Sequence, residues 1–343
     1  MHYQNLLSFT KMLLSKAGLS ASKALAVAET LLEAELLGHR THGLQLLGAY
    51  ISELESGGML KTGLPSVLKK KTAVQVWDGR YLPGPWLIRK AIELAMSKAK
   101  TYGTATIVIQ KSHHIACLAA YLERVTQQNL MILLASSDPM NKTVAPFGGT
   151  TGVYSPNPIA IGIPTSGQPI LVDVSMSATS NGFVAMKNNA NEKLPHAWLL
   201  KQNGGISNEP AVFFENPPAT ILPLGGIDTG YKGFGLAIMI EAMTNALSGF
   251  GRAELPERWG GSVFLQILDP DLFGGLGYFT KEMDYFIQES LKSTAIDSKN
   301  PVRLPGAKGL ALKKKQLENG VDLNAVTIKL LEKLAEKFKL DFL

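Results

Sequence analysis

The sequence predicts an α/β protein in which helices cover a buried sheet, and three observations support this. From about residue 80 onward, helical and strand patterns alternate along the chain. Residues 104–109 and 130–135 are continuous apolar runs, which are typical of strands covered on both faces. The chain has 343 residues, of which 45% are hydrophobic and 18% charged, enough for a large core divided between two or three lobes.

The first 78 residues predict a helical lobe. Apolar side chains recur at helical spacing over residues 3–55 and predict three helices, with Ser20 placed to cap the second one. Glycines mark the breaks between these helices. Two alternating runs follow, at 66–70 and 73–77, and predict a pair of short strands.

Residues 79–299 predict the sheet-forming unit, and residues 300–343 a C-terminal helical segment. Within the first of these, residues 138–228 are rich in Gly, Pro, Asn and Ser, and a stretch so full of turns usually builds a site rather than a core. Further strands are expected at 159–164, 170–174, 197–201 and 262–268. Helices are expected near 83–100, 115–128, 230–248, 280–295, 308–319 and 322–339.

Charge and composition exclude several classes of protein. The net charge is +6, and much of the basic excess lies near the C-terminus without interleaved aromatic residues, so we expect no nucleic-acid partner. No apolar run approaches membrane-spanning length, and the first twenty residues lack a signal-peptide pattern. The single cysteine excludes an internal disulfide and suits a reducing compartment, so we expect a cytoplasmic protein without a membrane partner. The basic excess comes from Lys313, Lys314, Lys315, Lys329, Lys333, Lys337 and Lys339.

Four of the six histidines form two clusters, His39 with His42 and His113 with His114. Imidazole changes charge near neutral pH, so two converging clusters would supply an acid/base pair, and this favours an enzyme. The same histidines could bind a metal, but no acidic residue lies close by in sequence to complete a site. We therefore expect no metal, with a metallohydrolase as the remaining alternative.

Cys117 lies one helical turn after His114 and invites comparison with a Cys/His hydrolase. Its neighbours are small and apolar, which is typical of a buried, inert thiol. We therefore favour a packing role for this cysteine.

The glycine-rich stretch 225–235 precedes a predicted helix and contains Lys232. Glycines allow close backbone approach, and a helix start offers free N–H groups to a phosphate, so a cofactor loop and a tight packing turn are both compatible with it. It is not a P-loop, and no Gly-x-Gly-x-x-Gly occurs in the chain, which counts against a Rossmann dehydrogenase.

Seven short motifs together give the chain a resemblance that covers about residues 30–330. In this order the sequence resembles the second malate/L-lactate dehydrogenase family, which includes sulfolactate, ureidoglycolate and diketogulonate oxidoreductases and reductases of cyclic imino acids. Seven motifs in the same order are far more specific than any one of them. The motifs are Thr41-His42-Gly43 with Tyr50, Ser112-His113-His114, Val144-Ala145-Pro146-Phe147-Gly148-Gly149, Pro156-Asn157-Pro158-Ile159-Ala160, Asp173-Val174-Ser175, Pro223-Leu224-Gly225-Gly226 leading to Lys232-Gly233, and Val302-Arg303-Leu304-Pro305-Gly306.

The resemblance implies a non-Rossmann, sulfolactate-dehydrogenase-like fold: a mixed sheet flanked by helices, with a helical lobe formed by both termini. It also implies a homodimer that uses NAD or NADP, with residues 79–299 as the cofactor-binding unit. His114, His42 and Asp173 correspond to catalytic positions, and Thr41, Tyr50 and Asn157 to substrate-binding ones. The implied cofactor contacts are Ser136, Asp173, Ser175, Gly226, Tyr231, Lys232, Arg303 and Gly306.

The chain departs from the family pattern at several of these positions. Leu46 stands where many members have an arginine that grips the substrate carboxylate, Tyr231 where a histidine is common, and Ala307 where an acid follows. Reversible hydride transfer between nicotinamide and a small 2-oxo/2-hydroxy acid is the expected activity. Reduction of a cyclic imino acid (piperideine- or pyrroline-2-carboxylate) and a non-catalytic, ligand-binding relative are the alternatives.

Overall fold

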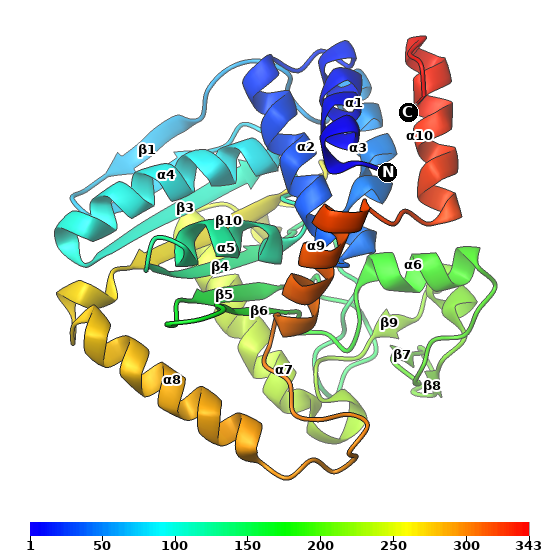
Figure 1. Cartoon of the computed structure of the whole chain (residues 1–343). Coiled ribbons are helices and arrows are strands. Elements are labelled where there is room, and N and C mark those ends of the chain that lie inside the picture. The colour runs from blue at the N-terminus through cyan, green and yellow to red at the C-terminus, as the bar shows by residue number, and fades with distance from the viewer. Residues whose placement is uncertain (343) are drawn as a thin grey trace.

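The computed structural model describes residues 1–342, and a seven-stranded mixed sheet lies at its centre (Figure 1). The strand order is β1-β2-β3-β10-β4-β5-β6; β2 and β3 are parallel, and every other neighbouring pair is antiparallel. A separate three-stranded sheet has the order β8-β7-β9. The strands are β1 (Ser66–Lys70), β2 (Val74–Asp78), β3 (Thr104–Ser112), β4 (Met131–Ser137), β5 (Ile159–Ile163), β6 (Ile170–Val174), β7 (Leu199–Leu200), β8 (Ile206–Ser207), β9 (Thr220–Ile221) and β10 (Gly261–Leu268).

Helix α4 (Gly84–Tyr102) makes the crossover between the parallel strands β2 and β3. Pro85 in its first turn suits a helix start, and Gly103 ends it in the left-handed conformation with φ 79°. Its apolar face packs on the sheet and forms one core with β3, β4 and β10. The covered sheet that the sequence predicts is therefore confirmed.

Helices from both ends of the chain form one lobe beside the sheet (Figure 1). Leu6 and Leu31 share an apolar core with Leu331 and Leu334, as the fold prediction required. The Gln316 amide donates to the carbonyls of Glu35 and Leu36 at the end of α2, at 2.9 and 3.0 Å, and so joins the two ends of the chain. The helices of this lobe are α1 (Tyr3–Lys16), α2 (Ala21–Leu36), α3 (Leu47–Ser56), α9 (Ala307–Asn319) and α10 (Ala325–Phe338).

Two details of the predicted organisation need correction. Strands β1 and β2 fall within the first 78 residues but belong to the sheet, because β2 pairs with β3 along its length. The helix expected at 115–128 is shorter: a 3-10 turn (Leu118–Tyr121) leads into α5 (Leu122–Thr126), since Ala116 has φ +58°, which no right-handed helix contains.

The three remaining helices lie in the second half of the chain. The helix expected at 230–248 begins earlier, at Gly226, and passes into a π-helical turn (Ala242–Ala246). Among residues 1–342, no helix is both long and apolar enough to cross a membrane. These helices are α6 (Asn181–Asn189), α7 (Gly226–Glu241) and α8 (Leu276–Lys292).

Candidate active site

The two histidine clusters come together at a cavity of about 430 Å³. The rings of His42 and His114 lie at its wall, stacked with their centroids 5.9 Å apart and their planes 25° apart. His42 comes from a 3-10 turn (Arg40–His42) after α2, and His114 follows the end of β3. The helical lobe and the sheet thus each contribute one imidazole.

Surrounding contacts orient both rings. The Thr41 hydroxyl lies 3.0 Å from Nδ1 of His42. The Tyr50 hydroxyl lies 2.8 Å from Nδ1 of His114, and the backbone N–H of Ala116 donates to the same nitrogen at 3.3 Å. Because a backbone N–H can only donate, Nδ1 of His114 is the acceptor, and the neutral ring carries its proton on Nε2.

Burial keeps these imidazoles neutral. It lowers the pKa of His42, although the nearby Asp173 carboxylate acts in the opposite direction. Burial lowers the pKa of His114 well below the usual value, and His42 and His113 add to the effect. The cavity therefore disfavours a histidine that stays protonated and suits one that takes up a proton and passes it on.

His113 supports the site from behind. It is fully buried, and its Nε2 lies 3.3 Å from a carboxylate oxygen of Glu53. Burial, with a smaller contribution from Arg258, lowers its pKa to about 3. The ring centroid of Trp259 lies 5.0 Å from that of His113 and 4.9 Å from that of His114. Trp259 also lines the smaller cavity. Trp259 lies 145 positions after His114, so nothing near it in the sequence indicates their contact.

Asp173 lies where this cavity meets a larger one of about 820 Å³. It is in β6, and its carboxylate accepts the Ala119 N–H at 2.8 Å. Arg303 and Lys308 line the larger cavity, which reaches the N-terminus of α9 at Gly306. A side chain at Gly306 would place its Cβ 2.7 Å from Cβ of Leu171 at a backbone with φ +82°, so the close approach of this loop to β6 requires glycine.

The predicted site residues divide into those that line a cavity and those that do not. Thr41, Ser136 and Ser175 line the smaller cavity, and Arg303 and Gly306 the larger one. Leu46, which replaces the arginine of many family members, also lines the smaller cavity, so its wall is apolar at this position.

Two predicted substrate contacts lie behind the cavity wall instead. Tyr50 is fully buried, and its hydroxyl is hydrogen-bonded to His114. It therefore orients the histidine and does not face the cavity. Asn157 is also fully buried: its amide donates to Glu241 at 2.8 Å and to the carbonyl of Ala237 at 3.4 Å. Its polar groups are satisfied inside the protein, which corrects the expectation of direct contact.

The glycine-rich stretch lies outside both cavities. Gly226, Tyr231 and Lys232 are in the first turns of α7, and Tyr231 is 55% exposed with its ring 6.0 Å from that of Phe147. A Cβ at Gly233 would lie 2.4 Å from the carbonyl oxygen of Leu224. Gly233 therefore lies in a tight packing turn, whereas a Cβ at Gly226 would meet no atom within 4 Å. Cofactor contact by Gly226, Tyr231 and Lys232 stays a prediction.

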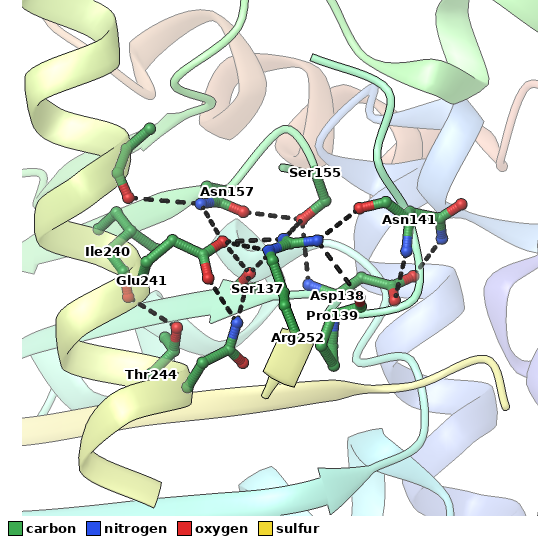
Figure 2. Close-up of polar contacts among 12 residues, drawn as sticks. Ser137, Asp138, Pro139, Asn141, Ser155, Asn157, Ile240, Glu241, Thr244 and Arg252 are labelled. Atoms are coloured by element: carbon green, nitrogen blue, oxygen red, sulfur yellow. Dashed lines mark hydrogen bonds and ion pairs between the residues drawn. The ribbon is translucent and has the colours of Figure 1, made fainter. Parts of the chain in front are cut away.

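A polar network around Arg252 braces the other side of the smaller cavity (Figure 2). The guanidinium donates to Glu241 at 2.8 and 3.0 Å, to Ser137 at 3.0 Å and to the carbonyl of Asn141 at 2.7 Å. Asn141 and the adjacent Asp138 line the cavity. Nothing near Arg252 in the sequence indicates its contacts with Ser137 and Asn141, which lie more than 100 positions away.

Comparison with known proteins identifies the family. The malate/L-lactate dehydrogenase family model matches residues 1–332. This chain belongs to that family. It is 28% identical over 341 residues to the malate/(S)-sulfolactate dehydrogenase of Methanothermus fervidus, covering 96% of this chain and 95% of the relative. The resemblance in the seven motifs is confirmed, and the family is one of oxidoreductases.

The family also includes cyclic imino acid reductases. The delta(1)-pyrroline-2-carboxylate reductase of Ancylobacter novellus is 27% identical over 336 residues, covering 94% of this chain and 93% of the relative. The crystal structure of delta1-piperideine-2-carboxylate reductase from Pseudomonas syringae pvar. tomato matches with a TM-score of 0.84 and 25% identity, covering 98% of this chain and 99% of that one.

Proposed function

We propose that this protein is an NAD(P)-dependent oxidoreductase that transfers hydride between nicotinamide and a small 2-oxo/2-hydroxy acid. The observation that carries the proposal is the pair of stacked imidazoles, His42 and His114, in the smaller cavity. This cavity meets the larger one, which basic side chains line. A histidine suits both directions, because oxidation needs a base for the hydroxyl proton and reduction needs an acid for the oxo oxygen.

The larger cavity suits the phosphates of a dinucleotide. Arg303 and Lys308 offer cationic donors, and α9 presents the N–H groups of its first turn beside them. Asp173 lies where the two cavities meet. The nicotinamide ring, which supplies the hydride when bound, would then lie toward the histidines, with Ser136 and Ser175 as polar contacts.

His114 is the proposed proton donor in reduction. Tyr50 and Ala116 hold Nδ1, so Nε2 is the nitrogen left for the substrate oxygen. His42, stacked beside it and hydrogen-bonded to Thr41, exchanges the proton with the cavity. A proton that enters this pair from the cavity and leaves to the developing alkoxide returns both rings to the neutral state, which burial favours.

A direct test is nicotinamide absorbance with a panel of oxo acids and each of NADH and NADPH. Turnover of at least one 2-oxo acid is expected. Calorimetric binding of the cofactor without turnover of any oxo or imino acid would favour the non-catalytic alternative.

A second candidate activity is reduction of a cyclic imino acid. Leu46 lines the cavity in place of an arginine that would bind a substrate carboxylate, and two of the relatives above are named as imino acid reductases. Loss of a charged hydrogen bond costs ~1.5–3 kcal/mol, which is enough to change substrate preference. Comparison of piperideine- and pyrroline-2-carboxylate with pyruvate and oxaloacetate would separate the two activities.

A homodimer is also proposed, because apolar side chains remain uncovered on α7 and α8. Helix α8 lies on the outside of the molecule (Figure 1) and has no buried residue; its Tyr278, Tyr285 and Phe286 are each more than 60% exposed. Such a patch marks an association surface in most water-soluble proteins. Light scattering should give twice the chain mass, and Phe286→Glu should reduce it. The unpaired, buried Cys117 is compatible with a cytoplasmic location.

A further inference from the structure

Three metal-ligating side chains from distant parts of the chain meet at the wall between the two cavities. His39 precedes the 3-10 turn that carries His42, Cys117 follows the turn after β3, and Asp173 is in β6. One ligand atom of each lies within 4.8 Å of the others. His39 and Asp173 line both cavities, and Cys117 lines the smaller one.

The spacing of these atoms suits a small tetrahedral cation. Sγ of Cys117 lies 3.6 Å from Oδ2 of Asp173. For Zn–S and Zn–O bonds of about 2.3 and 2.1 Å at a tetrahedral angle, the expected S···O separation is about 3.6 Å. The thiol proton now lies between these two atoms, and a metal ion would replace it.

The proposed hydride transfer assigns no role to His39 or Cys117. The His39 ring makes no hydrogen bond among residues 1–342, and the Cys117 thiol contacts only Asp173 through hydrogen bonding in the same part of the chain. A histidine nitrogen, a thiolate and one carboxylate form a donor set for Zn²⁺, and three protein ligands leave a fourth position for water.

We propose that His39, Cys117 and Asp173 form an inhibitory site for a thiophilic divalent cation such as Zn²⁺. Binding releases the thiol proton to solvent and changes no oxidation state. The ion would occupy the point where the two cavities meet, so it would exclude the cofactor. The exclusion depends on the proposed function, whereas binding of the cation does not.

Cobalt(II) tests the site independently of catalysis, because thiolate–cobalt coordination gives a strong charge-transfer band in the near ultraviolet. Cys117 is the only cysteine, so such a band can arise from this residue alone. Titration of the cofactor-free, full-length protein with Co²⁺ should produce the band at one equivalent. Cys117→Ser should abolish it, and His39→Gln and Asp173→Asn should each weaken Co²⁺ binding at least tenfold. His196→Gln, a histidine outside both cavities, is the matched control and should bind as wild type.

Competition tests the inhibitory role. The oxidised cofactor, NAD⁺ or NADP⁺, does not absorb in the near ultraviolet and should suppress the cobalt band. Zn²⁺ should inhibit turnover in wild type at a concentration at least tenfold lower than in Cys117→Ser, each rate being normalised to that protein without metal. Absence of the band, or unchanged Co²⁺ affinity in both His39→Gln and Asp173→Asn, would overturn the site. A normal band that neither NAD⁺ nor NADP⁺ affects would overturn the inhibitory role and leave the hydride-transfer proposal untouched.

Discussion

The two cavities of this protein differ in how they treat charge. The smaller one holds imidazoles whose pKa values burial lowers, whereas the larger one is open and presents the exposed side chain of Arg303. Proton transfer needs side chains that release a proton readily, as buried histidines do. Phosphate binding needs side chains that stay positively charged, as an exposed arginine does. Changes in the smaller cavity should therefore alter kcat or stability, and changes in the larger one the affinity for cofactor.

The largest stability effect is expected at Arg252, which braces the smaller cavity. Arg252→Met leaves the partly buried Glu241 carboxylate without its charged partner and should lower the free energy of unfolding by about 3 kcal/mol, the lower end for such pairs. Burial raises the pKa of Glu241, but the hydrogen bond and charge of Arg252, with hydrogen bonds from Asn157 and Ser137, together hold it below its usual value. Urea denaturation measures the change, and the double variant Arg252→Met/Glu241→Met should recover part of it. A loss below about 1 kcal/mol would show that the network is incidental.

Low pH should destabilise the folded protein through its buried histidines. The pKa of His113 is about 3 in the folded protein and about 6.5 when unfolded, so between these values the unfolded chain binds the additional proton. The free energy of unfolding should then fall as pH drops below 6.5, by up to about 1.4 kcal/mol per pH unit for this residue, and His42 and His114 have the same sign. Urea midpoints at a series of pH values test this, with His113→Phe expected to reduce the slope. A stability that rises toward pH 5 would contradict the account.

In the larger cavity, Arg303→Ala should weaken cofactor binding and leave the chemical step intact. Loss of one exposed, charged hydrogen bond costs about 1.5 kcal/mol, which corresponds to about a tenfold higher KM for NAD(P)H. Steady-state kinetics at saturating substrate measures both constants. A fall in kcat without a change in KM would reverse the assignment of the two cavities. Lys61→Ala, a lysine outside both cavities, serves as the matched control.

The smallest effect concerns the orientation of His114. Tyr50→Phe removes a hydroxyl 2.8 Å from Nδ1 while the Ala116 N–H remains, so kcat should fall about three- to tenfold, the equivalent of ~1 kcal/mol. A change in the pH dependence of kcat should accompany it, because the ring loses a partner. An unchanged kcat and pH profile would limit Tyr50 to packing.

Local patterns in the sequence predicted much of this structure. The helices, most of the strands and the histidine clusters are visible because each depends on neighbours within a few positions, as in the apolar run that became β4. The contacts of Arg252 and Trp259 are not visible, since folding alone brings their partners close. Tyr50 was identified through its motif, but its contact with His114 was not. A glycine-rich run gives the same signal for a tight turn and a phosphate loop, which is why 225–235 stayed ambiguous.

The central claim is that the two stacked imidazoles carry the proton during hydride transfer. The most direct measurement is kcat for reduction of the best substrate by His114→Ala, together with the cofactor Kd of the same variant. The account predicts that kcat falls about 10²–10⁴-fold while Kd changes less than about threefold. Full turnover by His114→Ala would contradict it.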